Sequence, residues 1–225
     1  MASMEELARE ALFQGDFKQL AMILKQWQPT EAEEAYEAYL NFSGYLAIEQ
    51  EDWKKAEVLY DSYVEKAKRE KNWENYHVGL HQKAMVLREQ GHLDAAQHLI
   101  AEEAEILTQY FPNDDYRLAV NLYEQGYLAL LQEDFIKAMP LLEKSLQLAL
   151  TTDDLVLQGC SWRGIGQYHL AQGNNGNAQE ALQQALQCFT LAEDSLGSAG
   201  VRALLEQATL TETVRREENS EDKMI

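Results

Sequence analysis

The stretch GYLAIEQEDWKKA, residues 44–56, recurs almost unchanged as GYLALLQEDFIKA at residues 126–138. Nine of the thirteen positions are identical, and the two copies lie 82 residues apart. Recurrence of a segment at a fixed interval is typical of folds that stack copies of one supersecondary unit. If the unit is half of that interval, another copy is expected midway, and GHLDAA at residues 91–96 lies there.

Five segments share one pattern: a Gly or Glu, a polar residue, usually an aromatic residue or Leu, and a small or apolar residue at the end. They are GDFKQL (15–20), EDWKKA (51–56), GHLDAA (91–96), EDFIKA (133–138) and GNNGNA (173–178). Their starts are separated by 36, 40, 42 and 40 residues. The first two residues of each segment predict a tight turn.

Apolar residues on both sides of these turns have helical spacing. After the second turn they recur at intervals of three and four residues, at Ala56, Leu59, Tyr60, Tyr63, Val64 and Ala67. Small residues, which let two helices approach closely, stand seven positions before each turn, at Ala8, Gly44, Ala84, Gly126 and Gly166. Each unit is therefore predicted to be a helical hairpin. Because one hairpin cannot bury both of its faces, the hairpins are expected to stack.

This pattern resembles the tetratricopeptide repeat (TPR), whose signature has a small residue at position 8, Gly or a substitute at 15, an aromatic residue at 17, Ala at 20 and a large apolar residue at 24. Position 24 is occupied here by Leu24, Tyr60, Ile100, Leu142 and Leu182. The resemblance covers roughly residues 3–196. The units are about 40 residues long, against about 34 in the family. Units of this length resemble those of the bacterial peptide-sensing regulators of the Rap and PlcR type.

The resemblance implies an all-α fold, a right-handed α-solenoid of about five TPR-like helical hairpins with a C-terminal capping helix. The predicted units of this single solenoid are about 1–29, 30–73, 74–113, 114–154 and 155–196, followed by a cap at 197–217. Ser3 with Glu6, and Thr30 with Glu33, have the spacing of a capping box at a helix start. Residues 218–225 are charged, lack apolar periodicity and are predicted to form a disordered acidic tail.

The charge of the chain argues against several classes of partner. It has 19 Lys and Arg against 38 Asp and Glu, a formal net charge of −19. Because a phosphate backbone is bound by clustered Lys and Arg, neither nucleic acid nor an anionic membrane is expected as a partner. No apolar run approaches the roughly 20 residues that span a bilayer, and no secretory signal is evident. With two cysteines and no disulfide framework, a cytoplasmic location is predicted.

In the TPR family the first helix of each hairpin lines a concave groove that binds peptides or partner proteins, through positions 5 and 9. With Arg88 added from position 12, the resemblance implies nine candidate groove residues: Asn41, Tyr45, His81, Met85, Arg88, Tyr123, Tyr127, Arg163 and Gln167. Aromatic residues, Met and Arg are frequent anchors of protein interfaces. Two alternatives stay open, since the tyrosines could instead pack against a neighbouring hairpin, and the arginines could form ion pairs within the chain.

No catalytic residue, cofactor or metal site is predicted. His77 and His81 share a helical face and could share a metal, but neither an HExxH glutamate nor a third ligand accompanies them. We therefore interpret them as polar groove residues. Cys160 and Cys188 are expected to pack as small apolar side chains. GCSWRGIGQ at 159–167 has neither GxGxxG nor P-loop spacing, so its glycines predict close helix packing.

Two functions fit these features. The first is a protein–protein interaction scaffold or adaptor that binds a peptide segment or a partner protein in the groove, and is not an enzyme. The alternative is a cytoplasmic receptor for a small signalling peptide, of the Rap and PlcR kind. Such a receptor would lack a DNA-binding domain of its own, because GDFKQLAMILKQW at 15–27 continues the repeat. The sequence leaves the partner and the oligomeric state open.

Overall fold

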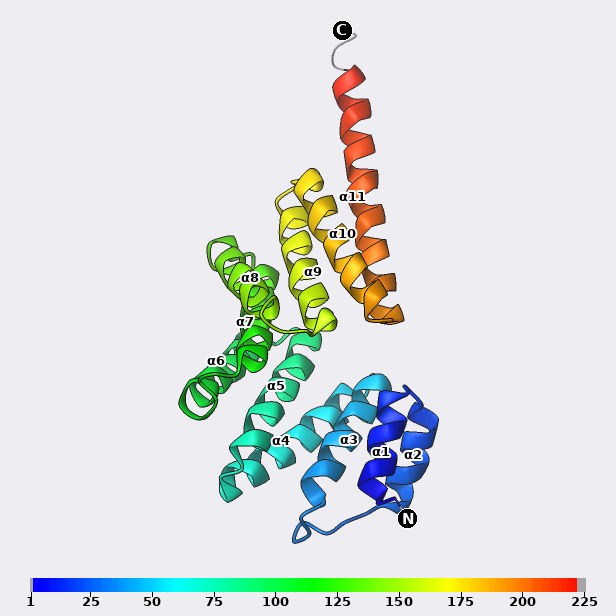
Figure 1. Ribbon diagram of the computed structural model, residues 1–225, viewed down its shortest axis with the longest axis vertical. Helices are drawn as coiled ribbons and strands as arrows, with labels where there is room; N and C mark the ends of the chain where they lie inside the picture. The colour runs from blue at the N-terminus through cyan, green and yellow to red at the C-terminus, as the bar shows by residue number, and fades with distance from the viewer. Residues whose placement is uncertain (1, 222–225) are drawn as a thin grey trace. The chain divides into compact units, whose positions relative to one another are not determined.

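The computed structural model describes residues 2–221, and the side chains of residues 2–209. Within this range the chain forms eleven α-helices and no strand, which confirms the predicted all-α class (Figure 1). The helices group into two compact units, one ending at Tyr110 and the other beginning at Phe111.

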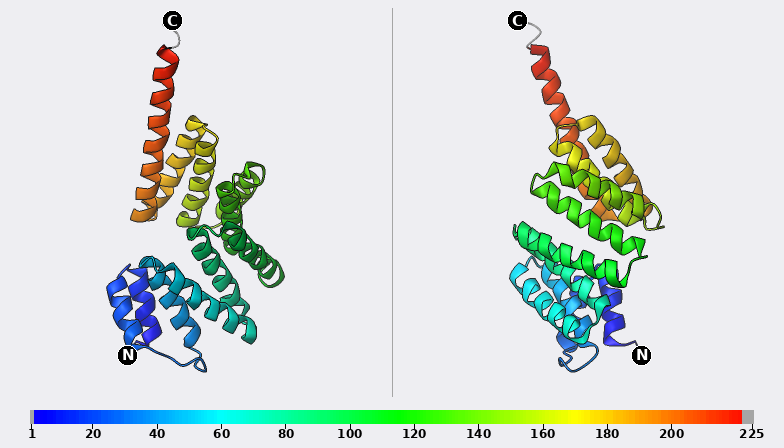
Figure 2. Two further views of the ribbon diagram at one scale, coloured as in Figure 1. Left: turned by 180° about the vertical axis from the view of Figure 1, so that it is seen from behind. Right: turned by 90° about the vertical axis from the view of Figure 1, so that its left-hand side faces the viewer.

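The first unit holds six helices, which are α1 (Met4–Phe13), α2 (Phe17–Gln26), α3 (Tyr36–Glu49), α4 (Trp53–Glu70), α5 (Trp73–Glu89) and α6 (Leu93–Tyr110). The second unit holds five, which are α7 (Asp115–Leu131), α8 (Phe135–Ala149), α9 (Leu155–Ala171), α10 (Asn175–Leu191) and α11 (Ser195–Glu221). The two helices of a hairpin lie side by side, as α9 and α10 do in Figures 1 and 2.

Each of the five predicted turns contains a left-handed residue at its first position. Gly15, Glu51, Gly91, Glu133 and Gly173 have φ between 54° and 80°. At the first turn the N–H of Asp16 donates back to the carbonyl of Ala11 at 2.8 Å, which closes α1. The Asp16 carboxylate then accepts from the N–H of Gln19 at 2.9 Å, which caps α2.

The recurring pair of Gly or Glu with a polar residue therefore has two local causes. The first residue ends one helix in the left-handed region, where glycine is unstrained. In the three pairs that contain aspartate, the second residue caps the next helix, since Asp52 and Asp134 repeat both hydrogen bonds of Asp16. Lys71 and Glu193, each with φ of 56°, form two further left-handed turns, before α5 and α11.

Glycines at position 8 allow the helices of a hairpin to approach closely. A Cβ on Gly44 would lie 2.5 Å from the Tyr60 ring, and one on Gly166 would lie 2.6 Å from Leu182 Cγ. Tyr60 and Leu182 are fully buried residues at position 24. The predicted role of the small residues is confirmed, because in both hairpins a larger residue at position 8 would overlap the residue at position 24.

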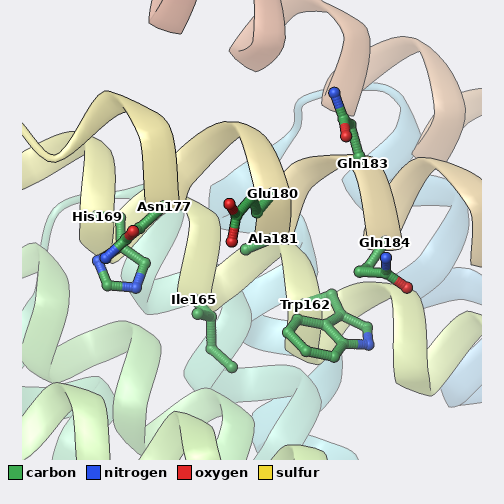
Figure 3. A pocket seen from close by; sticks show the side chains of 8 residues that line it. All are labelled: Trp162, Ile165, His169, Asn177, Glu180, Ala181, Gln183 and Gln184. Atoms are coloured by element: carbon green, nitrogen blue, oxygen red, sulfur yellow. The ribbon is translucent and has the colours of Figure 1, made fainter.

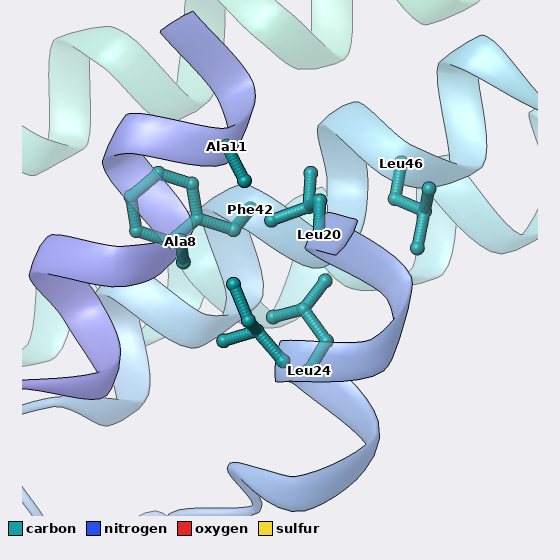
Figure 4. Packing of buried hydrophobic residues seen from close by; sticks show 7 residues of the cluster. Ala8, Ala11, Leu20, Leu24, Phe42 and Leu46 are labelled. Carbon is teal, nitrogen blue, oxygen red and sulfur yellow. The ribbon is translucent and has the colours of Figure 1, made fainter. Parts of the chain in front are cut away.

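The first unit begins with a core in which α1, α2 and α3 meet (Figure 4). Ala8 and Leu20 are fully buried in this core, and Phe42 packs against them from α3. The Ser3–Glu6 capping box at the start of α1 is present, as predicted.

Two predictions at helix ends differ from the structure. Thr30 and Glu33 are hydrogen-bonded to each other, but no helix starts there, since the chain continues through a turn and α3 begins at Tyr36. At the other end α11 extends to Glu221, so residues 218–221 of the predicted disordered tail are helical. Glu and Arg have high helix propensity, which favours the helical state of this charged segment. Residues 222–225 of that tail lie outside the described part of the chain.

Two of the apolar clusters of the second unit meet at Trp162 of α9. Leu142, Leu146 and Ile165 form one, and Phe189 and Val201 belong to the other, where α10 packs against α11. None of the helices within residues 2–221 combines the length and apolar character needed to cross a bilayer.

Candidate functional site

The nine predicted groove residues lie on the first helices of their hairpins, and each is half-buried. Those of the first unit are Asn41 and Tyr45 on α3 and His81, Met85 and Arg88 on α5. Those of the second unit are Tyr123 and Tyr127 on α7 and Arg163 and Gln167 on α9. The set of the first unit is called the first half-site and that of the second unit the second half-site, each within its own unit.

The second half-site brings Arg163 together with two tyrosines. The rings of Tyr123 and Tyr127 stack, with centroids 5.9 Å apart and planes inclined by 7°. Arg163 Nη2 donates to the Tyr123 hydroxyl at 3.1 Å, and its guanidinium carbon lies 5.8 Å from the centroid of the Phe189 ring. This arrangement fixes the guanidinium between α7 and α10.

Arg163 has no carboxylate within ion-pair distance among the side chains described, residues 2–209. Other basic groups of this unit do have such partners, since Arg117 pairs with Asp114 and Lys137 with Asp134. The alternative of an intrachain ion pair therefore does not describe Arg163. It does describe Arg88, which in the first unit contacts Glu89 at 2.9 Å.

Tyr123 combines packing with a polar function. Its ring lies against α9, where a Cβ on Gly164 would come within 3.1 Å of Tyr123 Cε2. Burial raises the pKa of Tyr123 to about 12, although Arg163 acts in the opposite direction. The phenol is therefore neutral at physiological pH. Because its oxygen accepts from Arg163, its own proton remains available to an acceptor on a ligand.

Two candidate groove residues carry buried amide oxygens without a hydrogen-bond partner in the described part of the chain, Asn41 Oδ1 and Gln167 Oε1. A buried acceptor without a donor costs about 1–3 kcal/mol. A bound peptide with free N–H groups could satisfy these oxygens after a small rotation of either side chain. One such amide lies in each half-site.

In the first half-site the polar side chains make more contacts with other residues of the chain than in the second. Gln82 Nε2 donates to the Tyr45 hydroxyl at 2.9 Å and so joins α5 to α3. His81 Nδ1 lies 3.0 Å from a carboxylate oxygen of Glu103 on α6, and His77 Nδ1 lies 3.6 Å from the other oxygen. His77 and Glu103 are buried, so this pair of histidines belongs to a buried polar cluster rather than to an open groove.

Glu103 was not recognised in the sequence, although a signal for it exists. It stands in the apolar stripe of α6, between Ile100 and Leu107, where a charged residue is out of place. No group of three His, Cys, Asp or Glu side chains in the part of the chain described is arranged to hold a metal ion.

A pocket of about 600 Å³ lies on the second unit and was not predicted (Figure 3). It is lined by three residues of α9 and five of α10, which are Trp162, Ile165, His169, Asn177, Glu180, Ala181, Gln183 and Gln184. Successive residues of a helix are about 100° apart, so Trp162, Ile165 and His169 face the side of α9 opposite to Arg163 and Gln167.

Comparison with known proteins supports the fold alone. No family model matches the chain, and no curated protein matches it. Among solved structures, BtubC from P. vanneervenii has 13% identity and a TM-score of 0.59, with 96% of this chain and 93% of that chain covered. A Podosopora anserina putative kinesin light chain with TPR-like repeats has 18% identity and a TM-score of 0.60, with 85% and 96% covered.

The structure of a Rap protein complexed with competence and sporulation factor has 14% identity and a TM-score of 0.81. It covers 95% of this chain, which in turn spans 60% of the Rap chain. At such low identities the likeness concerns the arrangement of helices. The recurring turns, the position 8 glycines and these structures together show that the chain has the TPR-like fold, an α-solenoid of helical hairpins.

Proposed function

We propose that the chain is a protein-interaction scaffold that binds a peptide segment or a partner protein along the first helices of its hairpins. The observation that carries the proposal is Arg163, a half-buried cation without a carboxylate partner among residues 2–209, in a chain with a net charge of −19. A partly desolvated charge without a counter-ion is unfavourable. A ligand carboxylate or carbonyl would therefore be stabilised beside it.

The neighbours of Arg163 support binding of a peptide. The stacked pair of Tyr123 and Tyr127 offers aromatic surface, and the neutral Tyr123 hydroxyl offers a proton donor. The Gln167 oxygen has no hydrogen-bond partner within residues 2–209 and can accept from a backbone N–H. Aromatic and arginine side chains are frequent hot spots of interfaces.

The test is capture of partners by the immobilised full chain from a lysate of the source organism, read by mass spectrometry. The test variant combines Tyr123→Phe with Arg163→Gln, which removes the hydroxyl and the charge but keeps the ring that packs on α9. The matched control is Arg202→Gln, which removes the charge of an exposed arginine on α11. We expect a protein or peptide that is retained by the unmodified chain and the control but lost by the test variant. Equal recovery by all three would refute the groove assignment.

The second candidate is a receptor for a short signalling peptide. The structure of the Rap protein with its bound factor favours it, because that structure matches 95% of this chain. The two proposals differ in where the ligand is found. A receptor should be stabilised against heat by the small-peptide fraction of spent culture medium, whereas a scaffold should respond only to cell lysate.

Other parts of the proposal concern location and chemistry. We propose a cytoplasmic location, which the free thiols of Cys160 and Cys188 support. We also propose that the protein has no catalytic activity of its own. Burial raises the pKa of Cys160, which disfavours the reactive thiolate there.

A further inference from the structure

The pocket on α9 and α10 has the size of a ligand site. Its volume of about 600 Å³ lies within the range of roughly 300–1,000 Å³ that such sites occupy. Trp162 and Ile165 supply apolar surface from α9, while α10 supplies exposed polar side chains. In Figure 3 the Glu180 carboxylate lies between the His169 ring at one end and the Trp162 ring at the other.

The residues that line this pocket carry charge of one sign only. Glu180 is exposed, and among residues 2–209 it has neither an ion pair nor a hydrogen bond from another side chain. No Lys or Arg is among the residues that line the pocket. Burial lowers the pKa of His169, with Glu143 of α8 acting in the opposite direction, so the imidazole is neutral at physiological pH. The residues that line the pocket therefore present negative charge, and none of these eight side chains carries a positive charge.

The remaining groups also favour a cation. The face of an indole attracts a guanidinium or an ammonium, and tryptophan does so best among the aromatic residues. The side-chain amides of α10, including Gln184, offer oxygen acceptors for the N–H groups of a guanidinium. Arginine fits this set better than lysine, because its planar head group can stack on an indole while its edge donates to a carboxylate.

We infer that this pocket is a second binding site, which takes an arginine side chain from a basic segment of a partner protein. The guanidinium lies against Trp162 and pairs with Glu180. The site is on the opposite side of α9 from Arg163, so it is independent of the proposed groove. The net charge of −19 favours the approach of such a segment to the chain.

The experiment titrates the ¹⁵N-labelled full chain with the peptide Ac-Ala-Ala-Arg-Ala-Ala-NH₂ at low salt and follows the indole N–H signal of Trp162. A Trp162→Phe sample identifies this signal among the four tryptophans. The matched probe replaces arginine with citrulline, which has nearly the same shape and no charge. A lysine peptide is the third probe.

We expect a saturable shift of the Trp162 signal with the arginine peptide, a weaker effect with lysine, and none with citrulline. Glu180→Gln should weaken binding about threefold to fivefold, as expected for a partly exposed ion pair. Glu206→Gln, which removes the same charge from an exposed position on α11, should leave it unchanged. Gln184→Arg places a cation at the pocket and should abolish binding.

Three results would overturn the inference. These are a Trp162 signal that does not move with the arginine peptide, equal binding of the citrulline peptide, and equal losses in Glu180→Gln and Glu206→Gln. The groove variant Arg163→Gln should bind the arginine peptide as the unmodified chain does. A failure of the groove proposal and a failure of this one are therefore distinguishable.

Discussion

Gly166→Ala tests whether close approach of helices within a hairpin is what the recurring small residues provide. The new Cβ would lie 2.6 Å from Leu182 Cγ and 2.7 Å from its Cδ2, while carbon atoms in ordinary contact are about 3.5–4.0 Å apart. Rotation about χ2 of Leu182 leaves Cγ in place and cannot relieve the overlap. A change of χ1 would move Cγ, but Leu182 is fully buried, so neighbouring side chains oppose it. Helices α9 and α10 would have to separate by about 1 Å.

The magnitude is the difference of two effects. Alanine stabilises a helix interior over glycine by about 0.8–1.0 kcal/mol. Overpacking of a buried site costs about 1–3 kcal/mol, and with two overlapping atoms we take the upper half of that range. The net expectation is a free energy of unfolding lowered by about 1–2 kcal/mol. Gly200→Ala is the control, because its Cβ would meet no atom within 4 Å, and it should stabilise α11 by about 0.5–1 kcal/mol.

Urea denaturation followed by circular dichroism at the helix band measures both changes. The two variants carry the same substitution in the same unit, so the opposite signs of their effects are the decisive result. If Gly166→Ala were as stable as the unmodified chain, the small residues at position 8 would not be required by packing, and the explanation of the repeat would fail.

The first two of three further predictions are measured by the same urea denaturation, and the third by thermal denaturation at several pH values. Gly91→Ala should lower the free energy of unfolding by about 1 kcal/mol, because φ at this residue is 80°, although no atom lies within 4 Å of the new Cβ. Gly176→Ala is equally open and has no positive φ, so it should be neutral or stabilising. Glu103→Ala should lower the free energy of unfolding by about 2–4 kcal/mol, because it leaves the imidazoles of buried His77 and half-buried His81 without their carboxylate. Exposed Glu105→Ala should stay within about 0.5 kcal/mol, and similar losses for both would contradict the buried cluster. Burial raises the pKa of Tyr123 to about 12, against about 10 for an exposed tyrosine. The stability that the neutral, buried phenol contributes is therefore complete below about pH 10 and is lost as the pH rises towards 12. The Tm of Tyr123→Phe should fall less over that interval than the Tm of the unmodified chain, and an equal fall would refute the burial of this phenol.

The turns could be predicted from sequence because their causes are local. A left-handed residue followed by a capping carboxylate or amide needs only two adjacent residues, as at Gly15 with Asp16. One prediction from a local signal was wrong, because Thr30 and Glu33 form their hydrogen bond without starting a helix. Whether a helix starts there depends on tertiary packing, which cannot be predicted from the spacing of two residues.

The candidate site could be predicted only in part. The position of a residue within the repeat determines which face of the helix it lies on, but not which side chains it contacts there. Position 5 placed both His81 and Arg163 on first helices, as the structure has them. It did not reveal that His81 contacts Glu103 of α6, or that Arg163 is held by Tyr123. Those facts join residues that are 22 and 40 positions apart in the chain.

The two copies GYLAIEQEDWKKA and GYLALLQEDFIKA show why architecture is easier to predict from this sequence than partner. Their identical positions include Gly44 and Gly126, which let helices approach, and the Glu–Asp turns, which end one helix and cap the next. These requirements are the same in every hairpin, so the same residues recur. The position 5 residues of these hairpins, Asn41 and Tyr123, lie just outside the repeated stretch and differ from each other. Residues that differ between equivalent positions are free of the common packing requirement, so we expect the specificity of the proposed scaffold to depend on them.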